Sequence, residues 1–142
     1  MKSTTSPALL VALLAAACPA AASDHLLGFE IRRALGGITL DGIYPGGVFF
    51  SETYGADGTI RYHDANGADS GQWAVRGDTF CTFYERQPGA CFYVLSHGAN
   101  CFTFHQAAES KSGRRAPTSD WSAEGWNRDR PATCPKAPEA EI

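Results

Sequence analysis

Histidines and a cysteine in the second half of the chain are the residues whose spacing first points to chemistry. His97, Cys101 and His105 recur every four positions, and imidazole and thiolate are preferred ligands of zinc. The segment around them alternates apolar and polar residues as a strand does, and positions four apart on a strand are separated by about 13 Å. Bonds from zinc to its ligands are only about 2.0–2.3 Å long. We therefore expect no metal ion and no other cofactor.

The cysteines are better explained as disulfide partners. Four of them, Cys81, Cys91, Cys101 and Cys134, follow an N-terminal segment with the features of an export signal. An even number of cysteines in an oxidising compartment predicts two bridges, and four cysteines allow three pairings. A redox-active pair would need a Cys-x-x-Cys motif, which the sequence lacks.

Residues 1–22 are predicted to be a signal peptide. Lys2 is followed by an unbroken apolar run over residues 8–17 and then by three alanines, which is the charged, apolar and small-residue order of export signals. The run is shorter than the about 20 residues that span a membrane. The alternative is a lipid anchor at Cys18, although the large aliphatic residue of a lipobox lies one position too early. We expect a periplasmic or secreted protein with no membrane span.

The composition of the 142 residues favours one β-rich domain. The 15 glycines and 8 prolines, with 11% aromatic residues, suit short strands joined by tight turns. The formal charge of −3 provides no basic field for nucleic acid, so we expect no nucleic-acid partner.

The apolar periodicity predicts one helix followed by strands. Leu27, Ile31 and Leu35 recur at helical spacing, which predicts a helix over about 25–35 that ends at Gly36. The period then changes to two, and short loops rich in turn-forming residues separate the runs. This pattern predicts an all-β fold, an antiparallel meander of about seven strands curled into a small barrel. The expected strands are 38–44, 47–54, 59–64, 72–76, 79–85, 91–96 and 101–106.

The lengths of the hairpin loops predict the register of the strands. A three-residue loop that ends at Gly47 pairs Leu40 with Glu52, and a similar loop in the next hairpin pairs Glu52 with Tyr62. One face of the sheet then carries the predicted core. Its members are Ile38, Leu40, Tyr44, Val48, Phe50, Tyr54, Ile60, Tyr62, Trp73, Val75, Phe80, Tyr84, Phe92, Val94, Phe102 and Phe104.

Glu52 is the member of this face that least fits a purely structural role. A carboxylate on the core side must be paired, neutral or placed at the mouth of the barrel. The structural alternatives are a position at the end of the sheet, in contact with water, or a register that slips by one residue. If the aromatic face lines a cavity, the candidate ligand-binding residues are Glu52, Tyr62, Trp73 and Tyr44. No residue is assigned a catalytic role.

Residues 23–106 are predicted to form the domain, and 107–142 an irregular tail packed on it, with the last residues disordered. Trp121, Trp126 and Cys134 indicate that the tail folds back and is pinned by a disulfide. The apolar residues on the outer face of the sheet, Phe83, Tyr93 and Leu95, need cover, which we expect the helix and the tail to provide.

The order of several motifs resembles the small exported proteobacterial proteins grouped as domain of unknown function (DUF) 995. The resemblance covers about residues 29–105. It implies an exported β-rich domain in which Cys81 and Cys91 pair, so that Cys101 and Cys134 are left for each other by parity, and it implies no activity. The motifs are Ala34-Leu35-Gly36-Gly37, Thr39-Leu40-x-Gly42, Tyr54-Gly55-Ala56-Asp57-Gly58, Gly71-x-Trp73-x-Val75 and Phe80-Cys81 with Cys91 downstream.

We expect a non-catalytic binding or interaction module of the cell envelope, whose partner is an envelope protein, a glycan or a small apolar ligand. One alternative is a lipocalin-like carrier of a small apolar ligand, and another is a small envelope hydrolase that uses Glu52. An interior cavity would favour the carrier, and a large exposed aromatic patch would favour the interaction module. A cleft that combines Glu52 with a second titratable group would favour the enzyme.

Overall fold

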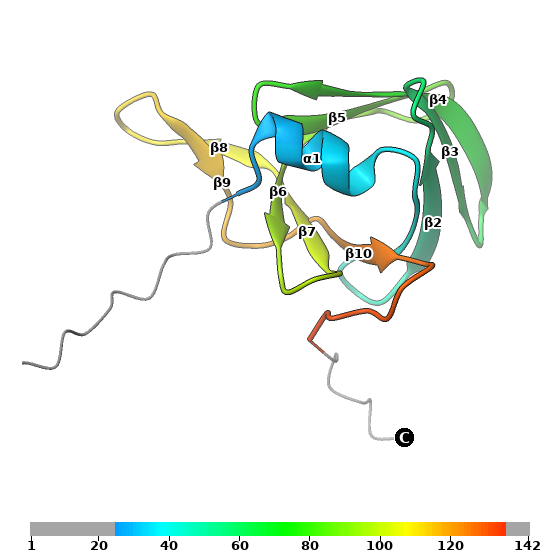
Figure 1. Cartoon of the computed structure of the whole chain (residues 1–142). Helices are drawn as coiled ribbons and strands as arrows, with labels where there is room; N and C mark the ends of the chain where they lie inside the picture. The colour runs from blue at the N-terminus through cyan, green and yellow to red at the C-terminus, as the bar shows by residue number, and fades with distance from the viewer. Residues whose placement is uncertain (1–24, 136–142) are drawn as a thin grey trace, which may run out of the picture.

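A closed antiparallel barrel of eight strands is the main feature of the computed structural model, which describes residues 25–135 (Figure 1). Its strands are β1 (Thr39–Ile43), β2 (Phe49–Tyr54), β3 (Thr59–Asp64), β4 (Gly67–Arg76), β5 (Thr79–Tyr84), β6 (Cys91–Ser96), β7 (Phe102–His105) and β10 (Ala123–Asn127). Their order around the barrel is β1-β10-β7-β6-β5-β4-β3-β2. The predicted all-β barrel is therefore confirmed.

The eighth barrel strand comes from the segment that the sequence predicts to be an irregular tail. β10 pairs with both β1 and β7 and so closes the barrel. The short strands β8 (Ala107–Glu109) and β9 (Arg115–Pro117) form a separate hairpin that projects from the barrel (Figure 1). The prediction of an irregular tail is thus wrong for the residues of these three strands. The apolar alternation fails in β10 because the positions that face Leu40 and the barrel interior are held by small residues, Gly125 and Ala123.

The strand register agrees with the register predicted from the loops. Leu40 lies opposite Glu52, and Glu52 lies opposite Tyr62. Gly46 and Gly47 have φ angles of 96° and 84° in the first hairpin loop, a left-handed conformation that glycine adopts without strain. β4 is longer than expected, because it begins at residue 67 and not at 72.

Ten of the sixteen predicted core residues are buried, and five more, Ile38, Tyr44, Val75, Tyr84 and Phe92, are partly buried and pack against them. Val48 is 48% exposed, because it lies in the loop before β2 begins. Ile31 and Leu35 add to this core from the helix. The aromatic side chains contact one another across the interior, with ring centroids 5.2 Å apart for Tyr54 and Phe80.

The helix α1 (Gly28–Leu35) closes one end of the barrel (Figure 1). It begins three residues later than the periodicity predicts, and Leu27 is 46% exposed rather than part of the buried stripe. The Gly28 amide donates to Oδ1 of Asp78 over 2.8 Å, which satisfies one of the free amides at the helix start. A Cβ atom at Gly28 would lie 2.3 Å from the carbonyl oxygen of Gly77, so this contact requires glycine.

Two disulfides join segments of the barrel. Cys81 pairs with Cys91 on the neighbouring strand, and Cys101 pairs with Cys134 beyond the end of β10. Both pairs agree with those expected.

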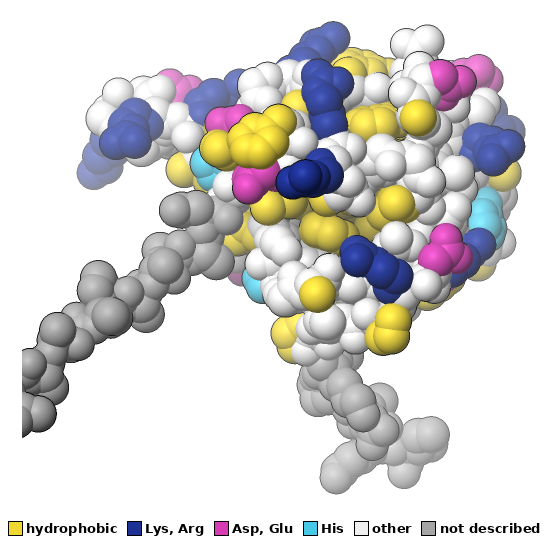
Figure 2. Space-filling view, in the orientation of Figure 1, with side chains coloured by type: hydrophobic (Ala, Val, Ile, Leu, Met, Phe, Trp, Pro, Cys, Tyr) yellow, Lys and Arg dark blue, Asp and Glu magenta, His cyan; other side chains and the backbone are white. Residues whose placement is uncertain are grey.

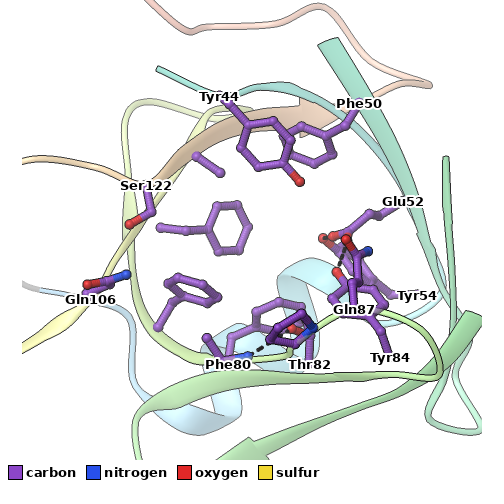
Figure 3. Close-up of a pocket in the computed structure, with 15 residues that line it drawn as sticks. Tyr44, Phe50, Glu52, Tyr54, Phe80, Thr82, Tyr84, Gln87, Gln106 and Ser122 are labelled. Atoms are coloured by element: carbon purple, nitrogen blue, oxygen red, sulfur yellow. Dashed lines mark hydrogen bonds between the residues drawn. The ribbon is translucent and has the colours of Figure 1, made fainter. Parts of the chain in front are cut away.

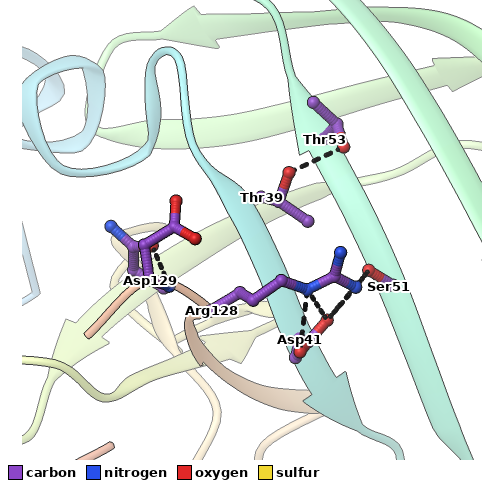
Figure 4. A network of polar contacts seen from close by, with 7 residues as sticks. Thr39, Asp41, Ser51, Thr53, Arg128 and Asp129 are labelled. Atoms are coloured by element: carbon purple, nitrogen blue, oxygen red, sulfur yellow. Dashed lines mark hydrogen bonds and ion pairs between the residues drawn. The ribbon is translucent and has the colours of Figure 1, made fainter. Parts of the chain in front are cut away.

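Arg128 fastens the strand that closes the barrel. Its guanidinium donates to both carboxylate oxygens of Asp41 on β1 and to the Ser51 hydroxyl on β2 (Figure 4). The hydrogen bonds from Arg128 hold the pKa of Asp41 below its usual range. The chain just after β10 is thereby tied to β1, which pairs with β10, and to β2, the next strand beyond β1.

The cover of the outer face differs from the expectation. The Arg76 guanidinium lies 4.9 Å from the ring centroid of Phe83, and the His25 ring lies 4.6 Å from that of Tyr93. The helix covers the barrel end and not this face. Figure 2 shows that hydrophobic side chains on the visible face are separated by basic and other polar groups.

The predicted signal peptide (1–22), Cys18 and the end of the tail lie outside the described residues. In the part of the chain that is described, no helix has the length and apolar character needed to span a membrane.

Candidate functional site

A cavity of about 210 Å³ lies inside the barrel, at the end opposite α1 (Figure 3). In this view the α1 ribbon lies behind the cavity, which is consistent with one plugged end. The mouth carries polar side chains from three loops, Gln87, Gln106 and Ser122. The wall below the mouth is mainly aromatic and is formed by Tyr44, Phe50, Tyr54, Phe80, Tyr84, Phe92 and Phe104.

The aromatic wall follows from the alternation of the strands. β2, β5, β6 and β7 each carry at least one aromatic ring at their inward-facing positions, and these rings contact one another around the cavity. Tyr44 stacks on Phe50 with centroids 4.5 Å apart, and Phe80 lies 5.5 Å from Phe104. The result is a concave apolar surface with a few convergent polar groups, which is the usual composition of a small-molecule site.

Glu52 projects from β2 into this cavity and is 6% exposed. The Tyr54 hydroxyl donates to its Oε2 atom and the Tyr84 hydroxyl to its Oε1 atom (Figure 3). Burial raises the pKa of Glu52 above its ordinary value, although the two hydrogen bonds oppose this shift. Burial and the neighbouring carboxylate also raise the pKa of both tyrosines, which therefore remain protonated donors.

A second chain of hydroxyls runs beside Glu52. The Tyr44 hydroxyl donates to that of Tyr62 over 3.3 Å, and the Tyr62 hydroxyl donates to Oδ2 of Asp64 over 2.8 Å. Asp64 is at the outer end of β3 and also accepts the amides of its own turn. These tyrosines connect the cavity wall to the surface without adding a cationic group.

The structure brings together two of the four predicted ligand-binding residues. Glu52 and Tyr44 line the cavity, whereas Tyr62 does not line it and instead accepts the hydrogen bond from the Tyr44 hydroxyl. Trp73 does not line this cavity. It lies near the α1 end, where its indole nitrogen donates to the Gly55 carbonyl over 2.9 Å.

Sequence reasoning missed the two tyrosines that bind Glu52 as its partners. Tyr54 is two positions from Glu52 on one strand, so the period-two rule alone places both side chains on one face. Tyr84 is 32 positions away, and no local pattern connects it to Glu52. The polar residues at the mouth were missed because they lie in loops, where alternation gives no signal.

The histidines considered for zinc serve as hydrogen-bond partners. His97 and His105 both bond the Thr103 hydroxyl, over 2.7 and 2.9 Å, and Cys101 is held in its disulfide. Sulfur atoms of Cys101 and Cys134 also lie near the Glu124 carboxylate. A disulfide offers no thiolate to a metal ion, so this group has only one strong ligand.

No protein-family model matches the chain, and no curated protein and no solved structure shows significant similarity to it. The resemblance to the DUF995 proteins therefore stays a prediction. What the fold and the cavity define is a class, a small closed β-barrel with one end plugged by a helix and an accessible interior at the other.

Proposed function

We propose that this protein is a non-catalytic, exported small-molecule-binding barrel that carries a compact ligand in the cavity beside Glu52, in the periplasm or the surrounding medium. The cavity carries this proposal, because it combines a mainly aromatic wall with a buried carboxylate and a polar mouth. Its volume of about 210 Å³ is larger than the ~150 Å³ cavity that holds benzene in a protein core. A ligand with one ring, or a branched aliphatic group of similar size, fits this space.

Export is supported by the two disulfides, since disulfides persist in oxidising compartments such as the periplasm. The export signal predicted over residues 1–22 agrees with this location.

The alternative of an interaction module has weaker support than the carrier. The large apolar side chains that are exposed in the described residues are spread over the start of α1, the start of β2 with the loop before it, and the outer face of β5. A protein-binding surface would need them in one continuous patch. The aromatic residues that line the cavity, in contrast, gather around one space beside Glu52.

The hydrolase alternative lacks a partner for Glu52. Glycoside hydrolysis uses two carboxyl groups about 5–10 Å apart, and Glu52 is the one carboxylate among the described residues that line the cavity. Both of its oxygens already accept tyrosine hydroxyls, which suits a fixed recognition group.

Binding of one-ring probes tests the proposal. Benzyl alcohol, benzylamine and benzoate would be titrated into the mature protein by NMR, and at least one should bind in fast or intermediate exchange. Ala123→Leu fills the cavity from β10 and should weaken that binding at least about tenfold. Ala116→Leu is the matched control, because Ala116 is exposed on the separate β8–β9 hairpin. Failure of all three probes to bind, or equal binding to the Ala123→Leu variant, would overturn the proposal.

A further inference from the structure

We infer that the ligand of this cavity is a small organic cation, an ammonium group attached to an apolar body, with the positive charge placed against Glu52. This inference rests on the proposed function and specifies the chemical class of the ligand. It follows from the charge of the site, the direction of its hydrogen bonds and the nature of its wall.

The first observation is a carboxylate that has hydrogen bonds but no positive partner. In residues 25–135, no nitrogen of Lys, Arg or His lies within 4.0 Å of the Glu52 carboxylate. The titratable groups that face it from neighbouring elements are tyrosines, namely Tyr54 on β2, Tyr62 on β3, Tyr84 on β5 and Tyr44 beyond β1. A buried carboxylate without a counter-charge is costly unless it binds a proton or a cation.

The second observation is the direction of the hydrogen bonds. Tyr54 and Tyr84 each donate their single hydroxyl proton to Glu52, so their oxygens can only accept further hydrogen bonds. The Glu52 carboxylate also has acceptor capacity beyond these two bonds. An ammonium group supplies up to three donors and no acceptor, which complements a cluster of acceptors. An anionic ligand would be repelled by this carboxylate and would find hydrogen-bond donors only away from it, at mouth residues such as Gln87, Gln106 and Ser122.

The third observation is the aromatic wall. The faces of aromatic rings carry negative electrostatic potential and attract cations, most strongly where water is excluded. Tyr44, Phe50, Phe80 and Phe104 surround the space next to Glu52 and would contact the apolar body and the carbon atoms beside the nitrogen. Neutral apolar ligands would use the same wall but would leave the carboxylate without a partner.

Binding of a cation also has a consequence for protons. Because burial favours the neutral form of Glu52, the free protein retains a proton on this carboxyl to a higher pH than an ordinary glutamate does. An ammonium ligand replaces that proton, and one proton leaves to solvent. Its affinity should therefore fall as the pH falls through the pKa of Glu52 in the free protein, whereas the affinity of a neutral ligand should not change.

The experiment compares three probes of one shape and different charge. Benzylamine, benzyl alcohol and benzoate would be titrated into the mature protein near pH 7, and benzylamine again down to about pH 4. We expect benzylamine to bind at least about tenfold more tightly than benzyl alcohol, with benzoate weakest. Its affinity should decrease toward the lower pH, while that of benzyl alcohol stays constant.

Two glutamine variants locate the effect. Glu52→Gln should remove the preference for benzylamine over benzyl alcohol. Glu124→Gln should keep it, and it is a matched control because Glu124 is a barrel glutamate with a pKa also raised by burial, but it does not line the cavity. If Glu52→Gln does not fold, the cation inference is tested on the unmodified protein alone, by the order of the three probe affinities and by the pH dependence of benzylamine binding.

The outcomes separate the two proposals. Benzyl alcohol binding as tightly as benzylamine, or benzoate binding best, would overturn the cation inference and leave the small-molecule site intact. The same inference would be overturned by a Glu52→Gln variant that folds and keeps the preference for benzylamine. Binding of none of the three probes would overturn the proposed function itself, and the inference with it.

Discussion

Tyr84 donates a hydrogen bond to Oε1 of Glu52 across the barrel interior, although the two residues are 32 positions apart in the chain. This contact links β5 to β2, two strands that are not neighbours in the barrel. Together with the bond from Tyr54, it fixes the carboxylate at one wall of the cavity. A carboxylate held in this way can recognise a ligand without rearranging, which lowers the entropic cost of binding.

The stability of the protein should depend on pH through Glu52. Its pKa in the folded protein is raised, so its contribution to the free energy of unfolding is fully present below the ordinary value near 4.3 and is lost as the pH rises through the raised value. The Glu52→Gln variant can still form hydrogen bonds with both tyrosines. Its free energy of unfolding at pH 7 should therefore equal that of the unmodified protein or exceed it by up to about 1 kcal/mol. Urea denaturation at a series of pH values measures this difference.

The control for Glu52 is Glu85→Gln, since Glu85 is exposed just beyond β5. This variant should stay within about 0.5 kcal/mol of the unmodified protein at each pH. A Glu52→Gln variant that is less stable by the same amount at pH 4 and at pH 7 would show that burial of the charge is not the dominant effect.

The helix should stabilise the barrel through two side chains. Ile31 and Leu35 are fully buried at the barrel end, so Ile31→Ala should lower the free energy of unfolding by about 2–5 kcal/mol. Leu27→Ala, one turn earlier, should change it by less than about 1 kcal/mol because that side chain is half exposed. Equal losses for the two variants in denaturant titrations would mean that α1 does not pack as described.

Gly28→Ala should be destabilising even though alanine is the better helix former by about 1 kcal/mol. The added Cβ would lie 2.3 Å from the Gly77 carbonyl oxygen, so the start of α1 must move away from the loop that holds Asp78. We expect a loss of about 1–3 kcal/mol in thermal or chemical unfolding. Arg33→Ala on the exposed side of the helix is the control, and a Gly28→Ala variant as stable as this control would contradict the close contact.

The disulfide that follows β10 should contribute more than the one between β5 and β6. Cys101 and Cys134 are 33 positions apart in the chain, and Cys81 and Cys91 are 10 positions apart. By chain entropy, replacing the first pair by alanine should cost about 4 kcal/mol and replacing the second about 3 kcal/mol. Urea titrations of the two double variants give the order directly, and the reverse order would show that local packing outweighs the loop length.

The position of Glu52 could be predicted from the sequence because hairpin loops set the register. The loop that ends at Gly47 determines that Glu52 lies opposite Leu40, and a shift by one residue would turn its side chain to solvent. The same logic predicts the core face, apart from Val48, which lies outside the paired part of β2. Each of these inferences depends on neighbouring strands and a short loop.

The closing strand and the partners of Glu52 depend instead on long-range contacts. β10 has glycine at an inward position where a side chain would meet Leu40, with Cβ only 2.5 Å from its Cδ2 atom, so its sequence lacks the apolar alternation of a strand. Barrel closure brings Tyr84 toward Glu52, and neither loop length nor periodicity reports on closure. The cavity likewise depends on the packing of side chains from several strands, so no single segment of the sequence predicts it.

The most direct test of the ligand site is to locate a bound probe by NMR. At saturating benzylamine, intermolecular nuclear Overhauser effects should connect the probe to ring protons of Phe50, Phe80 and Phe104, and the Glu52 carboxyl carbon should shift. These contacts should disappear in the Ala123→Leu variant. Contacts confined to outer-face residues such as Phe83, with an unchanged Glu52 carboxyl signal, would contradict the assignment of the barrel cavity as the ligand site.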